Sequence, residues 1–182
     1  MARSTLIALL LSASTASAGQ TWIFEPGQAL VSVEVGPKAA RISAVSLALN
    51  GRFVEQEAGP VKAALRLDLA SFATGKSTRD AQLREAADAA AFPSILFEGT
   101  APARGEDGKL HFTGTLTVRG GAHPFDLTVA TVRIGSALYG HASFSLHLRD
   151  LGIPLPAGAP DDAHVEVDAG LRPERGTLAS SL

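Results

Sequence analysis

The stretch that decides the fold is KLHFTGTLTVRGGAHPFDLTV, residues 109–129. Its first half places apolar side chains on one face and threonine or histidine on the other, the apolar ones being Leu110, Phe112, Leu116 and Val118. Period-two alternation predicts a strand with one buried face. The pair Gly120–Gly121 then separates it from a second alternating run, so the stretch predicts an antiparallel hairpin.

The same alternation recurs in much of the chain, at residues 61–69, 124–134, 141–149 and 164–171. We count about eight such strands, the number at which a closed barrel holds either a packed interior or one small ligand. An antiparallel sheet with one apolar face needs a cover, and a single short helix cannot provide it. The sequence therefore predicts an all-β domain whose sheet folds on itself, as a sandwich or as a closed barrel.

The one predicted helix lies in STRDAQLREAADAAAFP, residues 77–93, and covers about 78–91. Ser77 and Asp80 fit a helix-capping signature, and Pro93 forbids continuation. We expect this helix to border one mouth of the barrel. Arg79, Asp80 and Arg84 form a polar cluster on it. Asp80 and Arg84 are spaced for a surface ion pair, and the alternative is a charged collar that meets the polar head of an amphiphile.

The N-terminus has the pattern of a secretory signal peptide over residues 1–18. Arg3 precedes a short apolar run, and Ala16-Ser17-Ala18 is a small-residue cleavage site. The run is too short for a membrane anchor. We expect cleavage after Ala18, a periplasmic or secreted location, one domain over 19–172 and a flexible tail over 173–182.

Composition and motifs exclude several classes of function. The net charge is −2 without a basic block, which argues against a nucleic-acid partner. The chain has no cysteine, and its five histidines fall on polar strand faces or in a turn, so neither a thiol nucleophile nor a metal site is predicted. We expect no cofactor, no stable membrane insertion and no enzymatic activity. Val132 and Ile134 fall out of phase with their strand, which indicates an exposed apolar patch or a β-bulge.

Four stretches together resemble the YceI-like proteins, a family of periplasmic, polyisoprenoid-binding, lipocalin-like domains. The resemblance runs from Trp22 to Leu171 and is carried, in order, by WIFEPGQALVSV, STRDAQLREAADAAAFPSILFEG, GTLTVRGGAHPFDLTV and ASFSLHLRDLGIPL. It implies an eight-stranded antiparallel barrel with an elongated apolar interior. It also implies binding of a polyprenyl or quinone-type lipid, with the protein acting as a carrier or sequestering protein.

On this interpretation an isoprenoid lipid lies against inward-facing side chains, which we predict to be Phe97, Phe112, Leu116, Phe125, Leu127, Phe144, Leu146 and Val167. Arg79, Asp80 and Arg84 would meet its head. The alternation alone cannot tell a hollow barrel from a filled one. Two other functions stay open: an interaction partner of a membrane complex, acting through its outer face, and an enzyme acting on a lipidic small molecule. Homodimer formation also stays open.

The chain departs from the family pattern at two motif positions. Gln28 and Gln82 stand where the family has histidine. Glutamine still forms hydrogen bonds but does not titrate. A role for these positions in proton transfer or metal binding is therefore not carried over to this chain.

Overall fold

The computed structural model describes residues 19–56, 59–105 and 107–174. It has one α-helix, α1 (Ser77–Ala86), two 3₁₀ turns (Lys38–Ala40 and Leu69–Ser71) and the following strands: β1 (Gln20–Val35), β2 (Ile42–Ser46), β3 (Leu49–Glu55), β4 (Val61–Asp68), β5 (Ser94–Ala101), β6 (Lys109–Val118), β7 (Gly121–Ile134), β8 (Ala137–His147) and β9 (Asp162–Pro173). The predicted signal peptide and residues 175–182 of the predicted tail lie outside the described residues.

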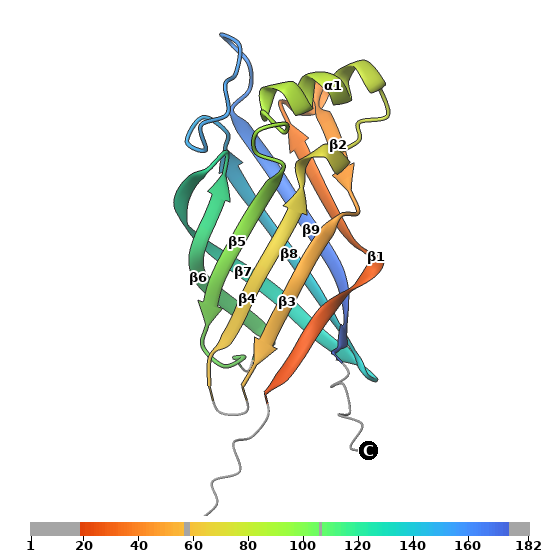
Figure 1. Ribbon diagram of the computed structural model, residues 1–182, viewed down its shortest axis with the longest axis vertical. Coiled ribbons are helices and arrows are strands. Elements are labelled where there is room, and N and C mark those ends of the chain that lie inside the picture. The colour runs from red at the N-terminus through yellow and green to blue at the C-terminus, as the bar shows by residue number, and fades with distance from the viewer. Residues whose placement is uncertain (1–18, 57–58, 106, 175–182) are drawn as a thin grey trace, which may run out of the picture.

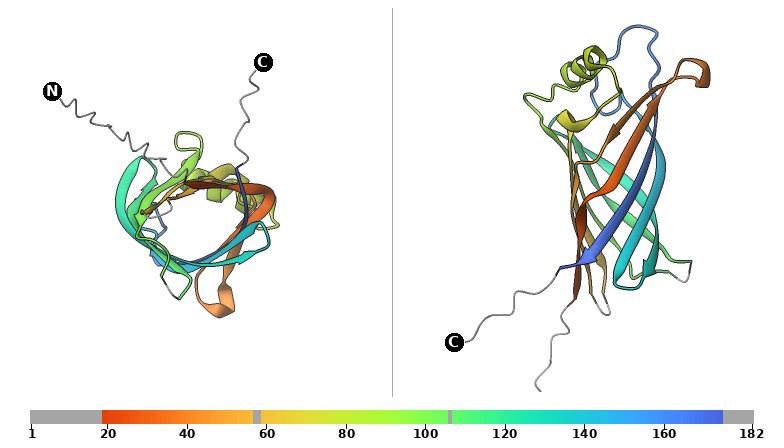
Figure 2. Two further views of the ribbon diagram at one scale, coloured as in Figure 1. Left: turned by 90° about the horizontal axis from the view of Figure 1, so that it is seen from below. Right: turned by 90° about the vertical axis from the view of Figure 1, so that its right-hand side faces the viewer.

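The strands form one antiparallel sheet that closes on itself through a β1–β9 pairing (Figures 1 and 2). Short strands β2 and β3 follow one another along the same side of β1, where Val31 pairs with Ser46 and Ile23 with Arg52. They therefore act as one interrupted strand, and the closed structure is an eight-stranded barrel. The predicted lipocalin-like barrel is confirmed, and the sandwich alternative is wrong.

A bulge divides β1 into two halves. The register with β9 shifts between Phe24 and Ala29, and Gly27 there has a φ of 73°, which glycine adopts without a steric penalty. The half before the bulge pairs with β3, and the half after it pairs with β2. The bulge thus lies where the partner strand of β1 is interrupted.

The predicted hairpin over residues 109–129 is confirmed, with each residue of β6 paired to one of β7. The turn residues are Arg119 and Gly120, whose φ values are 49° and 76°. Two successive left-handed residues are typical of the type I′ turn that joins tightly paired strands. Gly121 begins β7 instead of occupying the turn.

A row of aromatic rings crosses the barrel interior. Neighbouring ring centroids lie 5.2–6.3 Å apart along the series Phe24, Phe53, Phe112, Phe97, Phe125 and Phe144. Phe112, in the middle, is only 1% exposed. Tilted and edge-to-face pairs at such distances are the geometry that aromatic rings prefer.

Helix α1 lies across one end of the barrel, as predicted (Figure 1). It ends at Ala86 and not near residue 91, because Asp88 adopts a φ of 52° and the backbone turns there. The prediction of Ser77 as N-cap is wrong: Lys76 holds that position and makes no side-chain hydrogen bond to the helix. In the described part of the chain, no helix is both long enough and apolar enough to span a membrane.

The first two residues of the predicted tail belong to the sheet region. Pro173 pairs with Trp22 at the end of β9, and the Glu174 N–H donates to the Thr21 carbonyl over 2.8 Å. The strand pairing that closes the barrel therefore extends slightly beyond the predicted domain boundary at residue 172.

Candidate functional site

The barrel encloses a cavity of about 950 Å³, lined by residues from every strand and from α1. This volume lies at the upper end of the range of small-molecule binding pockets. The wall is almost wholly aliphatic and aromatic, and its polar side chains are confined to six residues: Glu55, Arg79, Gln82, Glu85, Arg104 and Thr131. The cavity is therefore suited to an apolar ligand that has polar groups, if any, at its ends.

The structure places seven of the eight predicted lining residues on the cavity wall: Phe97, Leu116, Phe125, Leu127, Phe144, Leu146 and Val167. The eighth, Phe112, is not on the wall. Its ring is fully buried and packs against the rings of Phe53 and Phe97, which do line the wall.

Several wall residues keep accessible surface although they point into the barrel. Phe125, Phe144 and Val167 pack against the core but are only partly buried. A side chain inside a barrel keeps such surface only where it borders a space as large as a water molecule. The barrel interior is therefore hollow along this side, a property that alternation alone could not predict.

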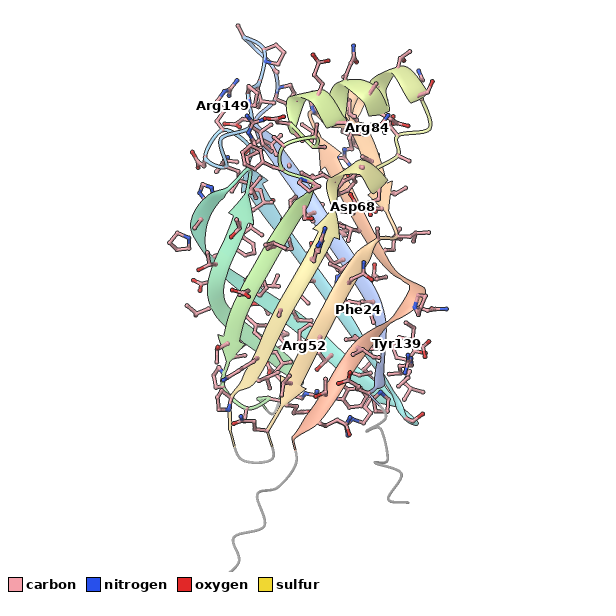
Figure 3. The ribbon with its side chains drawn as sticks, in the orientation of Figure 1. Phe24, Arg52, Asp68, Arg84, Tyr139 and Arg149 are labelled. Atoms are coloured by element: carbon pink, nitrogen blue, oxygen red, sulfur yellow. The ribbon has the colours of Figure 1, made fainter. Side chains whose placement is uncertain are left out.

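Helix α1 and the loop that joins β8 to β9 lie at the same end of the barrel, which we call the mouth (Figure 2), and both contribute to the cavity wall. From α1 and the turn after it, Leu83, Ala86 and Ala87 contribute to the wall, and the loop contributes Ile153 and Leu155. Figure 3 shows Arg84 on α1 and Arg149 at the start of the loop, both at this end of the barrel. The loop is a wall segment that the sequence analysis did not predict.

Of the three predicted headgroup residues, only Arg79 lines the cavity. The carboxylate of Asp80 accepts hydrogen bonds from the Thr74 N–H at 2.7 Å and from the Thr74 hydroxyl at 2.5 Å. These two hydrogen bonds, with smaller help from the charges of Arg84 and Arg79, lower the pKa of Asp80 despite some desolvation. Asp80 thus ties the start of α1 to the preceding loop. No ion pair joins Asp80 and Arg84 among the described side chains.

Four polar or aromatic side chains gather at the end of the barrel opposite α1, and we call Trp22, Glu55, Arg104 and Arg133 the basal cluster. Trp22 Nε1 donates to Glu55 Oε2 over 3.2 Å, and Arg133 Nη2 donates to the same oxygen over 3.3 Å. The Arg133 guanidinium lies 4.8 Å from the centroid of the Trp22 ring, within range of a cation–π interaction. Arg104 Nη2 lies 3.6 Å from Glu55 Oε1. Trp22, Glu55 and Arg104 line the cavity.

The basal cluster explains the irregular alternation at the end of β7. Val132 and Ile134 are 54% and 63% exposed, and the pairing of this segment with β8 continues without a shift. The bulge interpretation is therefore wrong. The positions in phase with the inward residues Leu127 and Val129 become polar, at Thr131 and at Arg133, whose side chain is half exposed. Sequence analysis missed the basal cluster, although this change of polarity within one strand was its signal.

The histidines lie away from the cavity wall, and three of them pair with carboxylates: His141 with Asp168 at 2.8 Å, His147 with Asp162 at 2.8 Å and His164 with Glu166 at 3.4 Å. Within the described ranges, no three histidine or acidic side chains are grouped to hold a metal ion. Gln82 lies at the mouth, whereas Gln28 lies on the outer surface, in a groove of about 480 Å³ beside the β1 bulge.

Comparisons with known proteins give one family match and several solved structures of similar fold. The model of the YceI-like domain matches residues 22–171. The fold is similar to the crystal structure of Burkholderia cenocepacia BcnA, with a TM-score of 0.72, 18% identity and coverage of 81% of this chain and 98% of that one. It is also similar to a polyisoprenoid binding domain from Saccharophagus degradans implicated in plant cell wall breakdown, with a TM-score of 0.69, 16% identity and coverage of 84% and 98%.

A third similar structure is the Campylobacter jejuni YceI protein, with a TM-score of 0.63, 14% identity and coverage of 77% of this chain and 89% of that one. No curated protein sequence matches the chain significantly. At these identities the solved structures support the fold, and the match of the domain model over most of the chain supports the family. The chain belongs to the family of YceI-like domain proteins.

Proposed function

We propose that this protein binds an isoprenoid lipid, a polyprenyl or quinone-type molecule, in the barrel cavity and acts as its periplasmic carrier or sequestering protein. The observation that carries the proposal is the apolar cavity of about 950 Å³ that extends from α1 to the basal cluster. Burial of hydrocarbon in such a space contributes roughly 25 cal/mol per Å² before the entropy of association is subtracted. A long chain without internal polar groups gains most from a wall of this kind.

The wall is suited to a methyl-branched chain. Aromatic rings and branched aliphatic side chains alternate on it, with Phe125 and Phe144 only 5.2 Å apart at their centroids. Methyl branches can pack into the spaces between such side chains, and many weak dispersion contacts add up along the chain. The name of the Saccharophagus degradans domain gives independent support for the isoprenoid class.

We assign the contacts with the lipid chain to the seven wall residues that the sequence analysis predicted. Phe112 acts as a support for the wall. At the mouth, Arg79 is positioned to contact a polar group that reaches α1. The predicted signal peptide and the family support the periplasmic location.

The test is native mass spectrometry of the protein purified from the periplasm, followed by organic extraction. We expect a bound species of isoprenoid mass that is lost on extraction, and renewed uptake when a polyprenyl lipid is added. A protein that carries no lipid and takes up none of the added polyprenyl lipids would contradict the proposal.

A second candidate function is docking of a protein partner on the outer face. The outer groove beside the β1 bulge is flanked by exposed apolar side chains, Leu30, Val132 and Tyr139, the last labelled in Figure 3. Exposed apolar side chains around a groove are typical of interaction sites. If the groove binds a second copy, Tyr139→Ser will abolish the dimer that sedimentation velocity detects for the wild type. A wild type that sediments as a monomer would exclude that occupant.

A further inference from the structure

We infer that the basal cluster binds the polar end of the lipid, so that the lipid lies with its head away from α1 and its chain directed toward the mouth. The group recognised is a hydrogen-bond acceptor, either a phosphate or a quinone carbonyl. This inference rests on the proposed function and adds an orientation and a recognition site to it.

The main observation is an unsatisfied hydrogen-bond donor on Arg104. Its Nε is buried and has no hydrogen-bond partner among the described residues, although Arg104 lines an apolar cavity. Its Nη2 is 3.6 Å from Glu55, a distance for an ion pair but too long for a good hydrogen bond. A guanidinium has five N–H donors, and a buried donor without a partner is unfavourable. An acceptor group on the ligand would satisfy this donor.

The charge balance of the basal cluster favours the same ligand. Glu55 is its one carboxylate, and Oε2 of that carboxylate already accepts from Trp22 and from Arg133. Arg104 and Arg133 together exceed Glu55 by one positive charge. Because apolar side chains surround the inner side of the cluster, an electrostatic interaction there is less screened than one in water. The cluster is therefore complementary to an anion or to the oxygen of a polarised carbonyl.

The mouth offers a weaker site for a head. Asp80 is bonded to Thr74, and Arg84 does not line the cavity. The side chains of α1 that do line it are Arg79, Gln82, Glu85 and apolar residues, so the charges there cancel. Gln82 and Glu85 are exposed to solvent, where a charged contact contributes little. A lipid head gains more from the donor at Arg104.

The position of the head can be measured in the wild-type protein. Trp22 is the only tryptophan of the chain and belongs to the basal cluster. A quinone ring quenches tryptophan fluorescence on contact. Titration with a quinone that carries a tetraprenyl chain should therefore quench Trp22 strongly, whereas squalene, which has no polar end, should bind without strong quenching. Saturable binding of the quinone with Trp22 left fluorescent would overturn the inference.

Variants can show whether the basal cluster binds the lipid head or only holds the end of the barrel together. We expect Arg104→Met to weaken binding of geranylgeranyl phosphate or of the tetraprenyl quinone by about ten-fold or more, because a charged hydrogen bond is lost, and to leave squalene binding unchanged. Arg133→Met removes a charge of the same cluster from outside the cavity wall and should weaken the polar-ended probes less. Arg66→Met, on the exposed face of β4, is the control that should leave all three probes unchanged. If Arg104→Met lowers the affinity more for geranylgeranyl phosphate, the acceptor is a phosphate; if it lowers the affinity more for the quinone, the acceptor is a carbonyl.

Three results would contradict the inference. In the first, Arg104→Met and Arg133→Met weaken all three probes equally, which indicates structural closure only. In the second, Arg79→Met weakens the polar-ended probes and Arg104→Met does not, which places the head at the mouth. In the third, the wild type binds squalene and neither of the other probes. A wild type that binds none of the three probes contradicts the proposed function itself.

Discussion

Individual phenylalanines of the barrel differ in what surrounds them, and this difference is testable. Phe112 is enclosed by protein, whereas Phe125 borders the cavity. We predict that Phe112→Ala lowers the free energy of unfolding by about 3–5 kcal/mol, since it creates a void in packed protein. Phe125→Ala should lower it less but weaken lipid binding more. Urea unfolding and lipid titration of both variants measure this, and equal losses of stability would indicate that the interior is filled.

Asp80 gives a prediction about pH. Its carboxylate holds Thr74, and its pKa is lowered in the folded protein. A lowered pKa means that the ionised form is the stabilising one. The contribution of Asp80 is therefore complete above the unfolded pKa of about 3.9 and is lost as the pH falls below it through the lower folded pKa. The protection factors of the α1 amides against hydrogen exchange should fall over that range.

Asp80→Asn provides the comparison for this experiment. The amide cannot titrate, so exchange of the α1 amides in the variant should already be faster at neutral pH and should lack this acid-dependent step. The prediction is wrong if wild type and variant show the same pH profile of protection in α1.

Among the elements, those with strong periodicity were predictable from sequence. The hairpin β6–β7 was expected because its alternation and its glycine both act locally. The end of α1 was not, because the alanines after residue 86 favour helix while Asp88 takes a left-handed conformation. The bulge in β1 and the loop wall at Ile153 and Leu155 were missed because they depend on contacts between segments distant in sequence.

Because α1 lies across one end of the barrel, we expect its attachment to the barrel to control the rate at which lipid enters and leaves the cavity. Arg119, in the β6–β7 turn, donates from Nη1 to the Ala86 carbonyl at the end of α1 over 2.8 Å. We predict that Arg119→Ala accelerates lipid release several-fold while the thermal midpoint changes little, because one partly buried hydrogen bond contributes only about 1 kcal/mol. Stopped-flow transfer of a fluorescent polyprenyl lipid to acceptor vesicles measures the rate.

A suitable control for the release experiment is Arg66→Ala, which removes an exposed arginine from the outer face of β4. Its release rate should equal that of the wild type. If both variants accelerate release to the same extent, a general effect of charge and not the attachment of α1 is responsible.

For the whole molecule, the residues alone left a sandwich or a barrel open, the family resemblance implied the barrel, and neither told whether the barrel is hollow. Inward positions are apolar in both cases, and the difference depends on how far side chains from opposite walls reach across a barrel of this strand number. The structure shows a cavity whose polar residues are confined to its two ends. The cavity, together with the family, supports lipid binding.

The most direct test of the central claim is to narrow the cavity and measure lipid uptake by native mass spectrometry. Val167→Trp places an indole in the cavity, and Glu166→Trp places the same ring on the exposed face of the same strand. We predict that the wild type and Glu166→Trp bind a polyprenyl lipid equally well and that Val167→Trp binds it more weakly while remaining folded. Undiminished uptake by Val167→Trp would contradict the claim that the lipid lies inside the barrel.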